Sequence, residues 1–388
     1  MASVESIQRV QENGELLRLW PEDGSRLRDD TLDRFLAWSH DQGASRIDIE
    51  TDRRVTLNIH GRVIRVTSEE MLASDVQASL SYMYRAESGL TTLRGGEPLD
   101  FGHRFWPNRR NNGKRYCFRV NASSSVIGPD KGISLVIRPI VEDPLRLEHQ
   151  HIEPEIMQAI DTGDGFTIIS GATGSGKTTV IGGCTCWRME DPNQHVNIFE
   201  GSAPTELLYD RVPRINATIT QVEVGRDVKT FAEFIRAGMR REPTDIIVQE
   251  IRDPDSMEAA IQAGISGHRV ITSLHTNDCS ATIRRAINLC PADQRDSLTI
   301  GFVENLRLLV NQRLLPSTDG RRTPIREFVP VTRKMRNALL DAPRDRWPFM
   351  VREAVEHEGQ SFARAIDKAL REGRISAETA SRAKHGEQ

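Results

Sequence analysis

Apolar and polar residues alternate along residues 45–67, SRIDIETDRRVTLNIHGRVIRVT, as they do in strands that bury one face. The next segment, SEEMLASDVQASLSYMYRAES, repeats its apolar residues at helical spacing after a candidate N-cap at Ser68. Strand-like segments return farther along, at residues 100–106, 115–123 and 133–140. A sheet with a helix packed against it makes an α+β domain, which we expect to span residues 1–142.

The pattern changes in the second part of the chain. Residues 143–154, rich in charge and bounded by prolines, are expected to form a linker. Four continuous apolar runs, FTIIS, VNIFE, DIIVQE and HRVITSLH, then alternate with helix-like segments, which is typical of buried parallel strands in an α/β core at residues 155–295. Amphipathic segments in SLTIGFVENLRLLVNQRLL and SFARAIDKALREGRISAETASRA predict a helical region at residues 296–388.

Composition places the chain among soluble globular proteins. Its 388 residues favour two domains, and 38% hydrophobic with 28% charged residues is an ordinary balance. The formal net charge of -3 does not favour a protein dedicated to nucleic acid. The first residues are too charged for a signal peptide, and no apolar run approaches the ~18 residues of a membrane span. We therefore expect a cytoplasmic protein whose association with a membrane is peripheral.

The five cysteines are scattered, at Cys117, Cys184, Cys186, Cys279 and Cys290. An odd number without CxxC spacing indicates reduced thiols, with neither a disulfide framework nor a zinc site. Cys184 and Cys186 stand two apart in an expected helix, where such positions point away from each other.

The stretch GATGSGKTTV follows the apolar run FTIIS, precedes a helix-like segment and fits the pattern G-x-x-x-x-G-K-[ST]. Its glycines let backbone N–H groups converge on phosphate oxygens at a helix N-terminus. Lys177 is expected to reach the β and γ phosphates, and the hydroxyl of Thr178 to ligate Mg²⁺. The stretch predicts a site for ATP and Mg²⁺ formed by Gly171, Ala172, Thr173, Gly174, Ser175, Gly176, Lys177, Thr178 and Thr179.

Hydrolysis also needs a carboxylate at the end of a neighbouring strand, and DIIVQEIRD supplies Glu250. Parallel strands place their carboxyl ends on the ligand side of the sheet. We expect Glu250 to orient the attacking water and to lie at the metal; the alternative is an N-cap carboxylate on the following helix. Glu200, which closes the apolar run VNIFE, is a second candidate for the same metal and water.

Two histidines, His268 and His275, bracket the apolar run RVITSL. His275 is expected to emerge at the end of that strand, where its imidazole can hydrogen-bond the γ-phosphate. On spacing alone, a histidine with a structural role is an equal alternative.

A basic belt occupies a stretch without acidic residues between Asp100 and Asp130. Guanidinium groups suit phosphate, so the belt is a candidate contact for nucleotide, nucleic acid or acidic lipid, the alternative being a solvated face. Its members are Arg104, Arg109, Arg110, Lys114, Arg115 and Arg119.

Several blocks together resemble one family, the secretion and pilus motors of the PilT/GspE superfamily. The blocks are GASRIDIE, RYCFRVNA, GATGSGKTT, QVEVGRDVKTFAEFIRAGMRREPTDIIVQEIRD, ISGHRVITSLHTNDCSATIRR and NQRLLP, in the family's order across roughly residues 43–330. The acidic box FEGSAPTELLYD and the tail GQSFARAIDKALREGRISAETA look most like the motor group of type IVB secretion and conjugation, with DotB and the plasmid-transfer TraJ. The chain lacks the tetracysteine insertion of type II secretion motors.

The resemblance implies a PAS-like N-terminal domain joined flexibly to a RecA-like P-loop ATPase domain, in a homohexameric ring. ATP would lie between the two domains, with Arg119 and Arg138 reaching phosphate from the N-terminal domain. Glu200 would correspond to the first acidic residue of the acidic box, Glu250 to the Walker B carboxylate and His275 to the histidine of the His box. Inner-membrane components of a secretion, conjugation or pilus apparatus would be the partners, and direct binding of nucleic acid is not expected.

The sequence departs from the family at three places. Gln249 replaces the glycine that normally precedes the Walker B glutamate, and Val222 stands where many relatives have arginine. The acidic box carries two additional residues, which leaves the alignment of Glu206 open. The leading hypothesis is an ATP-driven motor at the cytoplasmic face of the inner membrane. The alternatives are a nucleotide-gated assembly subunit with weak hydrolysis, which Gln249 favours, and a DNA translocase.

Overall fold

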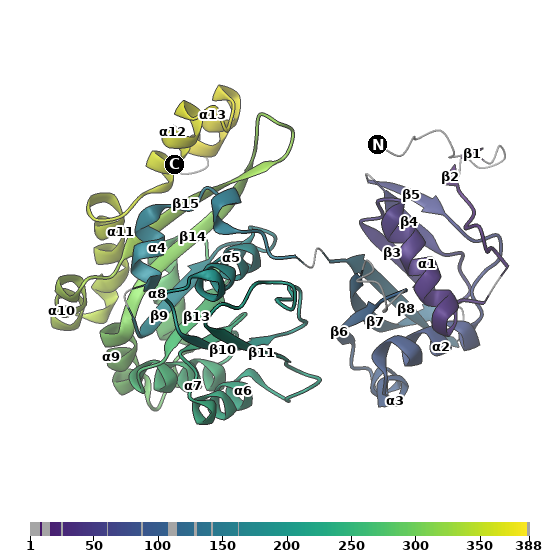
Figure 1. Cartoon of the computed structure of the whole chain (residues 1–388), viewed down its shortest axis with the longest axis horizontal. Coiled ribbons are helices and arrows are strands. Elements are labelled where there is room, and N and C mark those ends of the chain that lie inside the picture. Colours follow the sequence, from purple (N-terminus) through teal and green to yellow (C-terminus); the bar gives the residue numbers. More distant parts are fainter. Residues whose placement is uncertain are drawn as a thin grey trace. The chain divides into compact units, whose positions relative to one another are not determined.

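The structure is a computed structural model that describes residues 8–9, 16–24, 26–59, 61–86, 88–107, 115–127, 130–140, 143–161 and 163–385. The chain divides into two compact units, Met1–Glu142 and Asp143–Gln388, whose elements are labelled in Figure 1. Within the described ranges, no helix combines the length and the apolar character that crossing a membrane requires. Arg109, Arg110 and Lys114 of the basic belt lie outside the described residues.

The first unit is built on one sheet with the strand order β1-β2-β5-β4-β3-β8-β7-β6. All named pairs are antiparallel except β2 with β5, which is parallel. The strands are β1 (Gln8–Arg9), β2 (Leu16–Leu17), β3 (Arg46–Glu50), β4 (Thr56–Ile59), β5 (Arg62–Arg65), β6 (Leu99–Phe105), β7 (Tyr116–Ile127) and β8 (Asp130–Pro139). The helices are α1 (Asp29–Asp41), α2 (Ala73–Tyr84) and α3 (Ser88–Arg94).

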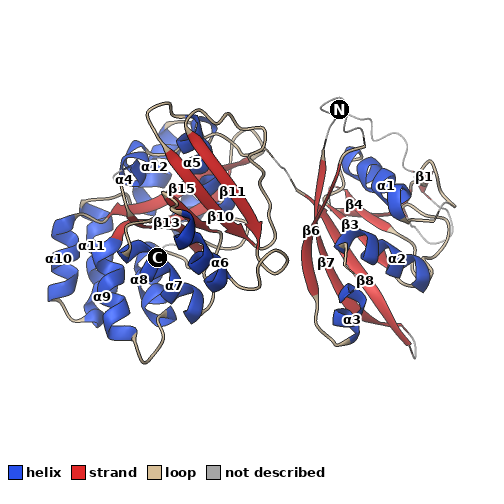
Figure 2. Cartoon of the chain, turned by 60° about the horizontal axis from the view of Figure 1, so that its bottom comes forward, coloured by secondary structure: helices blue, strands red, loops and turns tan. Residues whose placement is uncertain are grey.

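The helices of the first unit cover one face of its sheet (Figure 2). Alternate residues of the strands, such as Phe118 and Val120 of β7, pack there against Leu36 of α1 and Leu80 of α2. The alternation read from the sequence is therefore confirmed. The expected N-cap Ser68 is wrong, because α2 begins only at Ala73 and the Ser68 N–H donates to the carboxylate of Asp23.

The second unit has a seven-stranded sheet in the order β11-β10-β12-β13-β9-β14-β15, parallel except for the antiparallel pair β14 and β15. Its strands are β9 (Gly165–Ser170), β10 (Val196–Ser202), β11 (Ala217–Glu223), β12 (Asp245–Val248), β13 (Arg269–Leu274), β14 (Leu306–Pro316) and β15 (Arg322–Pro330). The four apolar runs coincide with β9, β10, β12 and β13, so the predicted parallel core strands are confirmed.

Helices cover both faces of this sheet (Figure 2). One apolar cluster packs α4 and α5 on one face, and a larger one packs α6 to α11 on the other. The helices are α4 (Pro154–Asp161), α5 (Lys177–Glu190), α6 (Phe231–Gly238), α7 (Pro254–Ile265), α8 (Cys279–Leu289), α9 (Arg295–Asn305), α10 (Arg333–Asp341), α11 (Trp347–His357), α12 (Phe362–Arg371) and α13 (Ala377–His385). Short 3₁₀ turns lie at η3 (Leu147–His149), η4 (Met239–Arg241) and η5 (Arg344–Arg346).

The expectation of a helical region from residue 296 onward needs correction, because residues 306–330 form β14 and β15. Only the first part of the amphipathic segment is helical, in α9, and the run LRLLVNQRLL becomes a strand beside β9. A continuous apolar run that is buried on both faces has no period that distinguishes strand from helix. From Arg333 to His385 the chain is helical, as expected.

A buried ion cluster stabilises the amino ends of the central strands. Asp245, the first residue of β12, is fully buried, and its Oδ1 lies 2.8 Å from Arg188 Nε of α5 and 2.9 Å from Arg269 Nη1 of β13. Thr244 adds a hydroxyl donor at 2.7 Å to the same carboxylate. A buried carboxylate with this many donors is compensated for lost hydration. These charges therefore stabilise the edge of the sheet opposite to the one from which residues 171–176 emerge.

Candidate functional site

The phosphate loop lies between the end of β9 at Ser170 and the start of α5 at Lys177. Its tip, residues 172–174, is exposed. Gly174 and Gly176 have φ angles of 76° and 87°, a region that side chains other than that of glycine seldom adopt. The first-turn N–H groups of a helix have no partner within the helix, so this turn presents donors and positive partial charge to an anion.

Lys177 is buried beneath this loop. Its Nζ donates to the carbonyl oxygens of Gly171 and Ala172, both at 2.9 Å, and lies 3.4 Å from His275 Nδ1. Burial lowers the pKa of Lys177, although the negative charges of Glu250 and Glu206 oppose that shift. The ammonium group thus occupies the position from which it can exchange carbonyl partners for phosphate oxygens.

Glu250 lies two residues beyond β12 and completes a chain of charged groups. Its Oε1 is 3.0 Å from His275 Nε2, and its Oε2 accepts from Arg252 Nη2 at 2.6 Å. Burial raises the pKa of Glu250, but Arg252 and His275 outweigh burial, so that the pKa lies below its usual value. Asp253 is the N-cap of α7, where its carboxylate accepts from Ser256 N–H, so the alternative that Glu250 caps this helix is wrong.

The two histidines that bracket β13 lie at opposite ends of the strand. His268 Nδ1 is 2.8 Å from the carbonyl oxygen of Pro243, away from the phosphate loop. His275 bridges Lys177 and Glu250, and its side chain is 40% exposed. His268 therefore makes a structural contact, whereas His275 lies between Lys177 and Glu250, and its hydrogen bond to the γ-phosphate stays a prediction.

Glu200 is buried at the carboxyl end of β10, with an exposed fraction of 6%. Burial raises its pKa to about 7, and hydrogen bonding by Tyr209 and Gln221 only partly opposes the rise. Gln221 Nε2 is 3.3 Å from Glu200 Oε1. A carboxyl group in this state holds a proton near neutral pH unless a cation arrives.

Glu200 borders a small cavity of ≈ 10 Å³, close to the space of one water molecule, next to Thr178. Glu206 of the acidic box lines the same cavity, so both acidic residues of EGSAPTE approach the loop despite the two additional residues. The cavity is lined by Thr178, Ile181, Glu200, Glu206, Leu207, Tyr209, Ile247 and Gln249.

These residues fit Mg²⁺. Glu200 Oε2 is buried and has no hydrogen-bond partner among the described residues, so an oxygen acceptor faces this region without a donor. In the described part of the chain no group of three or more His, Cys, Asp and Glu residues forms a metal cage. Mg²⁺ at a nucleotide site takes most of its ligands from phosphate and water, with one or two from protein. The hydroxyl of Thr178 and the carboxylate of Glu200 are the groups placed to supply or support those few ligands.

Gln249 and Val222, the departures from the family pattern, have ordinary surroundings. Gln249 Oε1 accepts from Ala203 N–H at 2.9 Å, so its amide is held against the acidic-box loop. Val222 pairs with Gly201 across β10 and β11 and packs on the apolar core.

Cys184 and Cys186 are buried in α5, where lost hydration raises each pKa to about 12 and keeps the thiols protonated.

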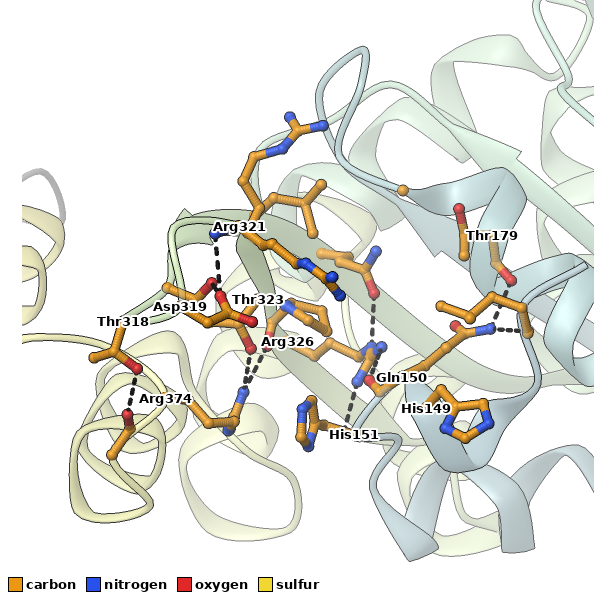
Figure 3. A pocket seen from close by; sticks show the side chains of 18 residues that line it. His149, Gln150, His151, Thr179, Thr318, Asp319, Arg321, Thr323, Arg326 and Arg374 are labelled. Carbon is orange, nitrogen blue, oxygen red and sulfur yellow. Dashed lines mark hydrogen bonds between the residues drawn. The ribbon is translucent and has the colours of Figure 1, made fainter. Parts of the chain in front are cut away.

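A pocket of ≈ 710 Å³ opens on the other side of the loop, beside Gly176 and Thr179. Figure 3 shows its wall, where Gln150 approaches Thr179 and Arg326 of β15 lies near His151. Its volume is within the ~300–1,000 Å³ that small-molecule sites occupy. It is lined by Leu145, His149, Gln150, His151, Gly176, Thr179, Gln312, Leu314, Ser317, Thr318, Asp319, Arg321, Arg322, Thr323, Pro324, Arg326, Gly373 and Arg374.

Arg119 and Arg138 stand opposite each other on β7 and β8, on the sheet face that the helices of the first unit do not cover. Arg119 forms an ion pair with Asp100 of β6, with Nε to Oδ1 at 3.0 Å, and Arg138 is exposed. Arg115 is instead buried, with its guanidinium 5.6 Å from the Trp106 ring. The structure thus brings together the two arginines that the resemblance selected, and assigns Arg115 to packing.

Sequence reasoning missed several residues around the site. Arg252 holds Glu250, and Gln312 of β14 contacts the phosphate loop through Ser175. Arg252 lies only two residues after Glu250, in the sequence EIRD, so its proximity in the chain was a local signal for this contact. Gln312 lies 137 positions from Ser175, so no local sequence pattern predicts that contact.

The raised pKa of Glu200 predicts a pH dependence of stability. Between pH 4.5 and about 7 the folded chain keeps a proton that the unfolded chain releases, so the free energy of unfolding should fall as pH rises. Glu200→Gln should remove this component, which is at most about 1.4 kcal/mol per pH unit. Urea denaturation at a series of pH values measures it. Exposed Glu155→Gln is the control, and parallel curves for wild type and Glu200→Gln would contradict the assignment.

Comparison with known proteins gives a family. A family model described as Type II/IV secretion system protein matches residues 29–324. The type IV pilus retractation ATPase PilT of Pseudomonas aeruginosa is 26% identical over 353 residues, which cover 90% of this chain and 96% of PilT. Protein YggR of Escherichia coli, which is uncharacterized, is 25% identical over 301 residues, or 78% of this chain and 87% of YggR.

Two solved structures are similar over nearly their whole length. The ATPase DotB of Legionella pneumophila superimposes with a TM-score of 0.88 at 28% identity, covering 96% of this chain and 100% of DotB. The pilus retraction motor PilT with bound ADP has a TM-score of 0.73 at 23% identity, covering 89% and 95%, and at that identity the likeness concerns the fold alone. The expected fold class, an N-terminal domain followed by a RecA-like ATPase domain, is confirmed. The chain belongs to the family of Type II/IV secretion system proteins, and it is an ATP-hydrolysing enzyme.

Proposed function

We propose that this chain is the ATP-driven motor of a bacterial type IV secretion, conjugation or pilus apparatus. The observation that carries the proposal is the convergence of Lys177, His275 and Glu250, from the ends of β9, β13 and β12, with separations of 3.4 and 3.0 Å. The likeness to DotB over the whole chain supports a secretion or conjugation system. The names of PilT and its relatives support a pilus system equally.

ATP fits this unit with its phosphates at the loop and its nucleoside in the large pocket. Thr179 of the first turn of α5 borders that pocket, so the chain of phosphates leads from Lys177 past Thr179 to the nucleoside. Mg²⁺, when bound at Thr178, neutralises charge on the phosphate oxygens and helps to align them for in-line attack. A cation at Thr178 would lower the pKa of the nearby Glu200, so that its carboxyl group would lose its proton.

The residues around the γ-phosphate then have distinct tasks. Lys177 turns its Nζ from the carbonyl oxygens of Gly171 and Ala172 to phosphate oxygens. Glu250 accepts a proton from the attacking water once one of its oxygens is released by Arg252. His275 contacts Lys177 through Nδ1 and Glu250 through Nε2, and thereby keeps Glu250 oriented. Hydrolysis removes the γ-phosphate contacts, and the difference in binding free energy between ATP and ADP is what biases a conformational change.

We further propose a homohexamer in which the first unit of the chain completes the nucleotide site. Arg119 and Arg138 supply the guanidinium groups, and the linker at residues 143–154 is the hinge between the domains. The ring would act on inner-membrane components of the apparatus, as a peripheral assembly at the cytoplasmic face. The resemblance of the sequence blocks to the PilT/GspE superfamily is what supports this arrangement.

Substitutions at the centre of the site separate binding from chemistry. Lys177→Ala should weaken ATP binding and abolish turnover, because the buried ammonium is the cation nearest the phosphates. Glu250→Gln should keep ATP binding but lower phosphate release about 10²–10⁴-fold, as expected for loss of a general base. Phosphate release and nucleotide affinity, measured on each purified protein, test both. Turnover like that of wild type in either variant contradicts the site.

Arg252→Gln should change the pH dependence of turnover. Without the guanidinium, burial raises the pKa of Glu250, so activity should decline at a higher pH than in wild type when the solution is acidified. Profiles of kcat/KM against pH for both proteins measure the shift. Exposed Arg284→Gln on α8 is the control, and superimposable acidic limbs would exclude this role for Arg252.

The paired arginines of the first unit should matter for turnover in the assembled ring. Arg119→Gln and Arg138→Gln should each lower phosphate release by about 10-fold or more, because charge-assisted contacts to phosphate stabilise the transition state. Exposed Lys131→Gln on β8 should not. Native mass measurement with ATP should give six times the 43.7 kDa of one chain. Full activity of both arginine variants in a hexamer would remove them from the site.

A further inference from the structure

Arg326 of β15 is a buried cation, 1% exposed, placed between the phosphate loop and the segment through which the chain reaches the second unit. It donates to the carbonyl oxygens of Gln150 and His151, both at 2.9 Å, and its Nη1 is 3.1 Å from Glu153 Oε2. Its Nε donates to Gln312 Oε1 at 2.7 Å. Each nitrogen of this buried guanidinium donates to at least one acceptor. Such a group rigidifies its surroundings, because loss of an acceptor would leave a buried N–H donor that water cannot reach.

Gln312 carries this network to the phosphate loop. Its Nε2 donates to the Ser175 carbonyl oxygen at 2.6 Å. The loop lies directly on this residue: an added Cβ at Gly171 would be 2.4 Å from the Gln312 carbonyl oxygen, and one at Gly176 would be 2.7 Å from Gln312 Nε2. The two end glycines of the loop therefore allow the close approach that this hydrogen bond needs.

The bond to Ser175 has a direct consequence for anion binding. In a planar trans peptide the C=O and the following N–H point in opposite directions. Gln312, by holding the Ser175 carbonyl on its own side, turns the Gly176 N–H away from β14 and toward the loop interior. Gln312 thus orients one of the backbone donors that cradle phosphate.

Gln150 closes the network on the other side of Lys177. Its Nε2 donates to the Thr179 carbonyl oxygen at 2.9 Å and to that of Leu145 at 2.6 Å. Gly183 of α5 permits this approach, since an added Cβ there would be 2.3 Å from Gln150 Nε2. The backbone on both sides of Lys177, at Ser175 and at Thr179, is therefore linked to Arg326 through one glutamine each.

We propose that Gln312 and Gln150, joined by Arg326, are positioning residues that couple nucleotide occupancy of the phosphate loop to the order of residues 145–151. This inference rests on the proposed function of the loop. A phosphate that binds the Gly176 N–H fixes the Ser175–Gly176 peptide group whose carbonyl Gln312 holds. Gln150 acts one turn later, because it holds the Thr179 carbonyl of the peptide whose Val180 N–H donates to the Gly176 carbonyl oxygen at 3.1 Å. By thermodynamic linkage, a ligand that stabilises the loop also stabilises residues 145–151, and an interaction that orders residues 145–151 strengthens ligand binding at the loop.

The test compares variants of similar volume in the full-length protein. Gln312→Met and Gln150→Met each remove one connection to the loop. Gln360→Met is the matched control, because Gln360 Nε2 bonds Glu153 and the Arg326 carbonyl in the same network but does not contact the loop. Thermal unfolding of each variant verifies that it is folded before binding is measured.

Two readouts are used, ADP affinity by calorimetry and amide hydrogen exchange of residues 145–151 with and without ADP. Wild type and Gln360→Met should show slower exchange in this segment when ADP is bound. Gln312→Met should bind ADP about 10-fold or more weakly, which corresponds to roughly one charge-assisted hydrogen bond. Because Gln150 also lines the pocket, its variant is compared in the presence of inorganic pyrophosphate, which has no nucleoside to contact residues 145–151. Gln150→Met should lose the pyrophosphate-dependent protection of the segment that wild type shows, an effect that loss of a direct nucleoside contact would not produce.

The outcomes distinguish this coupling from the proposed function. Wild type that binds no ADP would overturn the assignment of the nucleotide site itself. Wild type that binds ADP with no change of exchange in residues 145–151, or folded Gln312→Met and Gln150→Met variants that match Gln360→Met in both readouts, would overturn the coupling and leave the nucleotide site in place.

Discussion

Parallel hydrogen bonding among β12, β13 and β9 is the constraint on which the rest of the second unit depends. It brings the carboxyl ends of the three strands to one edge of the sheet. Leu274 of β13 pairs there with Ser170 of β9, and Val248 of β12 pairs with Thr272 of β13. The side chains that follow, Lys177, Glu250 and His275, come from segments up to 98 residues apart in sequence yet meet within hydrogen-bond distance. A shift of register in one strand would separate them even if every residue were retained.

The ionisable side chains at this edge contact one another and the loop carbonyl oxygens. Lys177, His275, Glu250 and Arg252 form a continuous chain, and the loop carbonyls complete the coordination of the ammonium group. A triphosphate therefore replaces existing partners and does not meet bare buried charges, so binding is an exchange of hydrogen bonds whose net free energy is modest for each contact. Glu200 is the exception, because its buried Oε2 has no partner in the described structure, and a cation is what would compensate it.

Much of this architecture could be predicted because its signals are local. The phosphate loop, Glu250 and His275 each follow a recognisable apolar run, and the core strands were located from the same runs. The strand β14 could not be recognised, since a run buried on both faces carries no period. Gln312, Arg326 and Gln150 were missed for a different reason: except for Leu145, the partners that link them to one another and to the loop lie 14 to 176 positions away, and a single glutamine or arginine has no pattern that indicates a buried partner. The roles of Arg119 and Arg138 at the nucleotide remain predictions.

The ion cluster of Asp245, Arg188 and Arg269 has a mechanical meaning when it is set against the ligand edge. Its donors and acceptors are all protein groups, and they lie at the amino ends of the strands, at the edge of the sheet away from residues 171–178. The two ends of α5 thus differ: Arg188 near the carboxyl-terminal end is held by the buried Asp245, while Lys177 at the other end is held by loop carbonyl oxygens. Under the proposed mechanism only the Lys177 end of α5 exchanges partners, so a displacement of the loop would be transmitted along a helix that is fixed at its other end.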